Sequence, residues 1–154
     1  MADDLLDLES FLPYRLNRLA EAISREFARI FRDRHGLTRP EWRTLATLGQ
    51  FGRMTATAVG AHSAMHKTKV SRAVADLERR RWLTRTPDMR DRRVEHLELT
   101  KAGRAVYRDM APLAKAYQEG LLGRMTDDER AALDTALGAL EDAARNPKSA
   151  TAAP

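Results

Sequence analysis

The spacing of apolar residues is helical along most of this chain and changes to a strand pattern in one interval. Between residues 10 and 35 apolar side chains recur every three or four positions, at Leu12, Leu16, Leu19, Ile23, Phe27 and Ile30. This spacing places them on one face of a helix. Two short runs, 83–86 and 94–99, flank a polar gap at 87–93, a pattern typical of a β-hairpin. The chain is therefore predicted to be mainly α, with one small β-hairpin.

Residues that favour helix ends divide the helical part into segments. Ser10 is predicted to cap the first helix and Gly36 to end it. Thr38 and Thr126, each followed three residues later by Glu, form capping boxes, and Thr55 and Thr100 are further N-caps. Glycines at 49–52 and small residues at 61–64 mark breaks. The predicted order is helix 10–35, helix 38–48, short helix 55–59, helix 65–80, hairpin 83–99, a helix from Thr100 through Leu121, a helix from Thr126 through Leu140, and a flexible tail 146–154.

Composition excludes several classes of protein. The 154 residues are 43% hydrophobic, enough for one domain with a real core. Because there is no cysteine, disulfides, thiolate metal sites and thiol nucleophiles are excluded. The longest stretch without a charged side chain, Met54–His66, is too short to span a bilayer, and the acidic start is unlike a signal peptide. We expect a soluble, cytoplasmic protein with no membrane partner.

The sequence contains no recognisable catalytic pattern. It has no HExxH, no GxSxG and no Gly-rich phosphate loop, and its four histidines lack metal-ligand spacing. We therefore expect neither an enzyme nor a bound metal or cofactor.

The positive charge is concentrated in the middle of the chain. Residues 62–104 carry twelve basic and six acidic side chains, whereas the net charge is +1 before them and −2 after them. A basic segment between near-neutral ones is expected of a nucleic-acid-binding protein, although a solvated basic face is the alternative.

The helix predicted at 65–80 has one apolar and one polar face. Val70, Ala73, Val74 and Leu77 share the apolar face; Thr68, Arg72 and Arg79 lie opposite, flanked by Lys69, Ser71 and Ala75. Arginine can bind guanine edges in the major groove, and lysine mostly contacts phosphate. An ordinary solvated helix is the competing interpretation.

The hairpin favours DNA over that alternative. Arg90, Arg92 and Arg93 crowd its tip, where an arginine fits the narrow minor groove, and Asp91 is placed to orient one guanidinium. Two helices joined by a tight turn and followed by a basic hairpin predict a winged helix-turn-helix, with double-stranded DNA as partner.

The sequence resembles the MarR family of bacterial transcription regulators over roughly residues 11–140. The resemblance is carried by residues 67–74, 77–80 and 91–93, and by Leu83, Arg85, Leu97, Leu99, Thr100 and Gly103. It implies an obligate homodimer that places one reading helix on each half of a pseudo-palindromic operator. It also implies a single domain at 1–145, in which helices 10–35 and 100–145 dimerise and 38–99 form the DNA-binding lobe.

The same resemblance carries the DNA contacts of the family over to Thr68, Lys69, Ser71 and Arg72 on the reading helix and to Arg92 at the wing tip. Beside these, we expect DNA contacts from Thr55, Lys67, Arg90 and Arg93. Two positions depart from the family pattern. Arg81 replaces the usual glycine after the reading helix, which predicts about 1 kcal/mol of strain there. His66 replaces the usual acidic residue or Asn at the start of that helix.

The resemblance further implies an effector pocket. Residues 11–15 and 40–43 look like a subgroup linked to aromatic-acid and acyl-CoA catabolism, and Arg15 with Trp42 would form an anion clamp beside an aromatic wall. An intersubunit salt bridge is the alternative role for Arg15. We expect a repressor released by a small aromatic acid or a CoA thioester. The alternatives are an effector-independent architectural DNA-binding protein and a small-molecule-binding dimer without DNA function.

Overall fold

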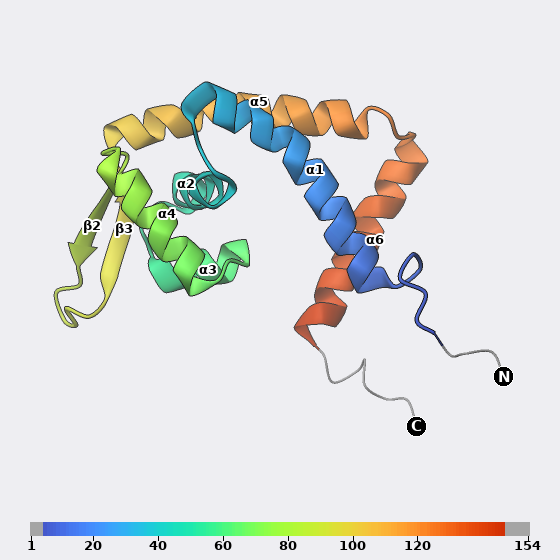
Figure 1. Ribbon diagram of the computed structural model, residues 1–154, viewed down its shortest axis with the longest axis horizontal. Helices are drawn as coiled ribbons and strands as arrows, with labels where there is room; N and C mark the ends of the chain where they lie inside the picture. Colours follow the sequence, from blue (N-terminus) through green and yellow to red (C-terminus); the bar gives the residue numbers. More distant parts are fainter. Residues whose placement is uncertain (1–4, 147–154) are drawn as a thin grey trace. The chain divides into compact units, whose positions relative to one another are not determined.

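The computed structural model describes residues 5–146 and is mainly helical with one small sheet, which confirms the predicted fold class (Figure 1). The contacts divide the chain into two compact units, residues up to Ala114 and residues from Lys115, which are described separately. In chain order the elements are α1 (Leu12–His35), α2 (Arg39–Phe51), β1 (Met54–Thr55), α3 (Ala56–Ser63), α4 (Lys67–Arg79), β2 (Leu83–Pro87), β3 (Glu95–Leu99), α5 (Lys101–Leu122) and α6 (Asp127–Arg145).

The sheet is antiparallel, with β3 between β1 and β2. The predicted hairpin pairs Leu83 with Leu99 and Arg85 with Leu97, and β3 begins at Glu95, one residue later than predicted. The third strand, β1, pairs Met54 with Leu97 and was not predicted. A two-residue strand is too short to show an alternating pattern, so only its partner strand reveals it.

Threonine caps fix the helix starts as predicted. Thr38 and Thr126 form complete capping boxes with Glu41 and Glu129, and the Thr55 hydroxyl accepts a hydrogen bond from the backbone N–H of Ala58. The Thr100 hydroxyl accepts one from the N–H of Gly103. The Ser10 cap was wrong: α1 starts at Leu12 behind Phe11, and the Ser10 hydroxyl donates to the Asp7 carbonyl instead.

Three predicted helix boundaries also differ in the structure. α2 continues through Gly49 to Phe51. A Cβ at position 49 would collide with the Tyr107 ring of α5, so the glycine there permits close helix packing. α3 reaches Ser63 rather than Val59, and Ala64 turns the chain with φ at 52°. α4 then begins at Lys67, two residues later than predicted.

The core of the first unit lies between α2, α4 and the sheet. Leu45 and Leu48 of α2 are buried with Val70, Val74 and Leu77 of α4, and the predicted apolar face of α4 is thereby confirmed. Val106 and Met110 of α5 complete this core. At its margin Trp42 stacks on Phe31, with ring centroids 5.9 Å apart.

Some apolar side chains belong to no core. In the first unit Leu12, Leu16 and Leu19 of the α1 stripe are each more than a third exposed, as are Leu5 and Leu6 before the helix. In the second unit α6 has no buried residue, and Leu133 and Leu137 are exposed on it. No helix within residues 5–146 is long and apolar enough to cross a membrane.

Gly103 makes the closest backbone approach at the start of α5. A Cβ there would overlap the backbone carbonyl of Trp82, which cannot swing aside as a side chain could. We expect Gly103→Ala to destabilise the fold by about 2–3 kcal/mol, since overpacking shifts backbone.

Gly120→Ala is the matched control for this prediction. Gly120 lies on the same helix with no atom within 4 Å of the position that an added methyl group would take, so alanine there should add about 0.5–1 kcal/mol of stability. Urea unfolding curves of both variants measure the difference. Equal stabilities would contradict the close packing at Gly103.

Candidate nucleic-acid interface

α4 presents a polar face because its opposite face is fully used in the core. Val70, Ala73, Val74 and Leu77 are at most 2% exposed. Lys67, Thr68, Lys69, Ser71 and Arg72 are all exposed, on the first half of the helix. The structure therefore brings together the predicted reading-helix residues on one accessible surface, over about two turns.

Both departures from the family pattern have a visible structural role. At the start of α4 the His66 ring nitrogen Nδ1 accepts a hydrogen bond from the backbone N–H of Thr68, so His66 caps the helix in place of an acid. After α4, Arg81 has φ at 60°, the left-handed conformation that favours glycine. The left-handed backbone of Arg81 agrees with the strain that the sequence predicted at that corner.

Cationic side chains on and beside α4 differ in whether they have a partner. Arg79 forms an ion pair with Asp76, with 2.8 Å between Nη2 and Oδ1. Within the described part of the chain, the Lys67, Lys69 and Arg72 side chains form no hydrogen bond or ion pair. The three cations of α4 are therefore available for phosphates or base edges.

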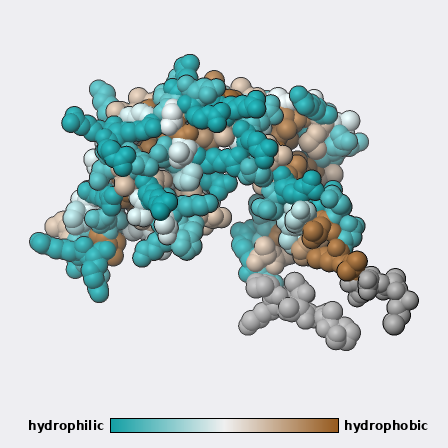
Figure 2. Space-filling view, in the orientation of Figure 1, coloured by the Kyte–Doolittle hydropathy of each residue, from teal (hydrophilic) through white to brown (hydrophobic). Residues whose placement is uncertain are grey.

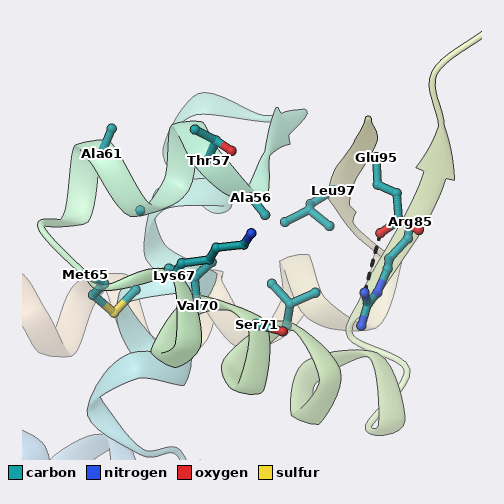
Figure 3. Close-up of a pocket in the computed structure, with 12 residues that line it drawn as sticks. Ala56, Thr57, Ala61, Met65, Lys67, Val70, Ser71, Arg85, Glu95 and Leu97 are labelled. Atoms are coloured by element: carbon teal, nitrogen blue, oxygen red, sulfur yellow. Dashed lines mark hydrogen bonds and ion pairs between the residues drawn. The ribbon is translucent and has the colours of Figure 1, made fainter. Parts of the chain in front are cut away.

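A groove of about 530 Å³ lies between α3, α4 and the sheet (Figure 3). Val70, Val74 and Leu97 form its apolar wall, and Lys67 extends across it. Ser71 lies at its edge, and Thr57 of α3 joins the lining. Thr57 was not predicted from the sequence, because only the packing of α3 beside α4 places it there.

Arg85 is held on the far side of this groove by two carboxylates. Its Nε donates to Glu78 of α4 at 3.0 Å, and its Nη1 donates to Glu95 of β3 at 3.4 Å. The pairs join the second half of α4 to β2 and β3. Arg85 therefore positions the wing, and its positive charge is balanced by these two carboxylates.

The wing tip separates its three arginines by role. Asp91 accepts two hydrogen bonds from the Arg93 guanidinium, both at 3.0 Å, which lowers the pKa of Asp91. This is the structural partner that the sequence suggested for one arginine. The side chains of Arg90 and Arg92 are exposed and, among residues 5–146, have no hydrogen-bonding or ionic partner.

Asp88 fixes the backbone of this tip. Its side chain bonds His96 at 2.9 Å and accepts hydrogen bonds from the backbone N–H groups of Asp91 and Arg90. The His96 hydrogen bond, followed by these two N–H groups, lowers the pKa of Asp88 to about 2. These hydrogen bonds hold the backbone of the tip in one conformation, while the side chains of Arg90 and Arg92 remain available.

The other predicted residues have different surroundings. Thr55 lies in β1 and uses its hydroxyl to cap α3. Trp42 packs against Phe27 and Phe31, whereas Arg15 lies twelve residues before Phe27 on α1, about 18 Å along the helix. One subunit therefore does not bring Arg15 and Trp42 together as a clamp.

Within residues 5–146 no group of three His, Asp or Glu side chains is placed to hold a metal ion.

Comparisons with known proteins identify the family and the fold. A family model described as MarR family matches residues 35–94, which include α2 to α4 and β2 and end just before β3. The MarR family transcriptional regulator SPO1453 of Silicibacter pomeroyi DSS-3 is 31% identical, with 88% of this chain and 99% of that chain covered and a TM-score of 0.74. No curated protein sequence matches.

Two further solved structures share the fold at lower identity. The PcaV transcriptional regulator of Streptomyces coelicolor, solved with its natural ligand, is 23% identical, covers 94% of this chain and 99% of its own, and has a TM-score of 0.73. BpsR of Bordetella bronchiseptica, whose DNA binding is regulated by 6-hydroxynicotinic acid, is 24% identical, covers 82% and 98%, and has a TM-score of 0.70.

The fold is thus that of a winged-helix transcription regulator. By its match over 99% of a family member at 31% identity, this chain belongs to the MarR family.

Asp88 gives the wing a defined pH dependence. Because the folded-state pKa is below the ordinary value, the stabilisation by the Asp88 charge is complete above about pH 4 and is lost as the pH falls toward about 2. We expect Asp88→Asn to lower the melting temperature at pH 6, and the difference from wild type to disappear near pH 2.

Asp134→Asn serves as the control, since Asp134 is an exposed aspartate of α6 without a side-chain partner in the described chain. Calorimetric scans between pH 2 and pH 6 measure both variants. An Asp88→Asn difference that stays constant over this range would show that the charge does not hold the wing.

Proposed function

We propose that two copies of this chain form a homodimer that binds a pseudo-palindromic site in double-stranded DNA. α4 enters the major groove and the wing tip reaches the adjacent minor groove. Helices 10–35 and 100–145 form the dimerisation region of a single domain, and residues 38–99 form the DNA-binding lobe. The proposed DNA contacts are Thr55, Lys67, Thr68, Lys69, Ser71, Arg72, Arg90, Arg92 and Arg93.

The observation that carries this proposal is the division between paired and unpaired cations. Arg79, Arg85 and Arg93 are matched by carboxylates of their own lobe. Arg72 and Arg92 are not, and unpaired cations at two neighbouring elements suit a partner with regularly spaced negative charge. The unpaired arginines supply the main contacts with DNA. The paired ones hold the geometry of the lobe, and among them only Arg93, at the wing tip, is also proposed as a secondary DNA contact.

Dimerisation is supported by the apolar side chains that no core covers. The α1 stripe is exposed at Leu12, Leu16 and Leu19, and α6 exposes Leu133 and Leu137. A run of exposed leucines on a helix is costly in a monomer and is typical of a protein interface. A second copy of the chain supplies the same apolar residues and can bury them symmetrically.

We further propose that the protein is a repressor released by a small aromatic acid or a CoA thioester. BpsR is regulated by 6-hydroxynicotinic acid, and PcaV was solved with its natural ligand, so ligand control occurs on this fold. Arg15 stays a candidate effector residue through its exposed guanidinium, and Trp42 through the aromatic cluster at the end of α1. An effector-independent architectural protein would instead bind DNA with loose sequence preference and no ligand response.

If α1 lies in the dimer interface, a charge placed on its apolar stripe should disrupt assembly. Leu16→Asp should prevent normal assembly and give monomer or aggregate, because it would bury a carboxylate without a partner. Asn17→Asp adds the same charge on another face of α1 and should leave the dimer intact. Analytical ultracentrifugation at micromolar concentration distinguishes these outcomes. A folded wild-type monomer under those conditions would contradict the proposal.

Arg72 and Arg92 should affect DNA binding in different ways. Arg72→Ala should cost about 1–3 kcal/mol per half-site and relax selectivity at one symmetric base position, since Arg72 faces a base edge. Arg92→Ala should weaken all sequences alike and lower the salt slope by about one unit per contacted half-site, since its minor-groove contact is mainly electrostatic.

Binding to single-base operator variants at two salt concentrations measures both effects, with footprinting of DNA flanking the gene used to find the operator. Arg93→Ala is the comparison for Arg92→Ala. It should weaken DNA binding less, because Asp91 already holds the Arg93 guanidinium. If Arg72→Ala scales affinity down without changing base preference, Arg72 is a phosphate anchor and not a base reader.

A further inference from the structure

Three helices of the first unit meet at the end of α1, well away from the exposed face of α4. α1 ends at Gly36, where φ is 63° and the backbone N–H donates to the Arg32 carbonyl. The next residue, Leu37, is buried and donates to the Phe31 carbonyl. This pair of bonds closes the helix and fixes the direction of its last carbonyls.

Asp109 of α5 holds this end of α1. Its two carboxylate oxygens accept from Arg34 Nε and Nη2, both at 2.9 Å, and Oδ2 lies 2.7 Å from His35 Nε2. The Arg34 hydrogen bonds, and then that of His35, hold the pKa of Asp109 well below its usual range. A bidentate arginine pair fixes orientation as well as distance.

Arg80, directly after α4, holds the same end of α1 from the other side. Its Nη1 donates to the His35 carbonyl and its Nη2 to the Gly36 carbonyl, both at 2.7 Å. The guanidinium also lies 4.8 Å from the centroid of the Trp82 ring, and the His35 and Trp82 rings are perpendicular, with their centroids 6.1 Å apart. One side of His35 therefore faces α5, and the other faces the end of α4.

We propose that the Asp109–His35–Arg80 junction is the fulcrum that sets the position of the reading helix relative to α1 and α5. The junction lies at the C-terminal end of α4, and the predicted DNA contacts lie at its N-terminal half. Asp109, Arg34 and Arg80 are positioning residues in this proposal, and none of them contacts DNA. The inference rests on the proposed function, in which α1 and α5 belong, with α6, to the dimerisation region.

The length of α4 makes its far end sensitive to this junction. Thirteen residues give a helix of about 20 Å. A rotation of about 10° at the junction would move the other end by about 3.5 Å, close to the rise of one base pair. Because the dimer repeats the movement in both subunits, a loosened junction changes the separation of the two reading helices.

Asp109→Ala tests the fulcrum through the spacing of the two half-sites. Wild type should bind best at one spacing and lose affinity when one base pair is inserted or deleted between the half-sites. In Asp109→Ala that loss should shrink by roughly three- to thirtyfold. The base preference within a half-site should not change, since the exposed face of α4 is untouched. A purely structural role would lower affinity equally at every spacing.

Two further variants keep the test decisive. Asp109→Asn keeps the size of the side chain and replaces the alanine variant if that variant does not fold. Arg80→Lys breaks the α4 side of the junction. Both variants should lose less affinity than wild type when the half-site spacing changes. Glu9→Ala is the control, because Glu9 also binds one arginine, Arg18, with both oxygens but lies outside the junction. If the junction variants fold and their affinity depends on half-site spacing as that of wild type does, the proposal that the junction is a fulcrum is wrong. A wild type without any spacing preference overturns the proposed dimeric function itself.

Discussion

The burial of one face of α4 is the constraint on which the interface depends. Val70, Val74 and Leu77 are locked against α2 and the sheet, and each is at most 2% exposed. Since side chains three or four apart share a helix face, fixing these three fixes the direction of every other side chain on α4. Thr68, Lys69 and Arg72 face outward as a consequence. Figure 2 shows the hydrophilic surface that results around the helices and the wing of this unit.

Internal ion pairs then determine which charges remain available. Arg85 and Arg93 carry the same charge as Arg72 and Arg92, but carboxylates two to ten residues away in the chain engage them. Exposed ion pairs contribute little to stability on their own. Their effect here is geometric, because they orient the wing and hold its tip while leaving other cations to a partner. A basic net charge alone would not have distinguished these two groups.

Polar contacts at the end of α1 also orient neighbouring elements, as the ion pairs of the wing do. Arg80 satisfies two helix-terminal carbonyls that would otherwise need water, and Asp109 collects donors from two consecutive residues of α1. The left-handed Arg81 and the tight approach of Gly103 to Trp82 lie beside these contacts. Close packing with few free torsions makes this region suitable for transmitting a rotation.

The mainly helical fold, the wing, and the two faces of α4 could be predicted from the amino-acid sequence, because helical and strand periodicities are local properties of the chain. The caps at Thr38, Thr55 and Thr126 could be predicted as well, since a cap depends on a few neighbouring residues.

Other features follow from contacts between residues that are distant in the chain. β1 exists through pairing with β3, and Gly49 lies inside α2, where the Tyr107 ring leaves no room for a side chain. Tertiary packing also separated Arg15 from Trp42 and joined Asp109 to His35, which lie 74 residues apart in the chain. Contacts between distant residues depend on how the helices pack, and no local pattern in the sequence specifies that packing.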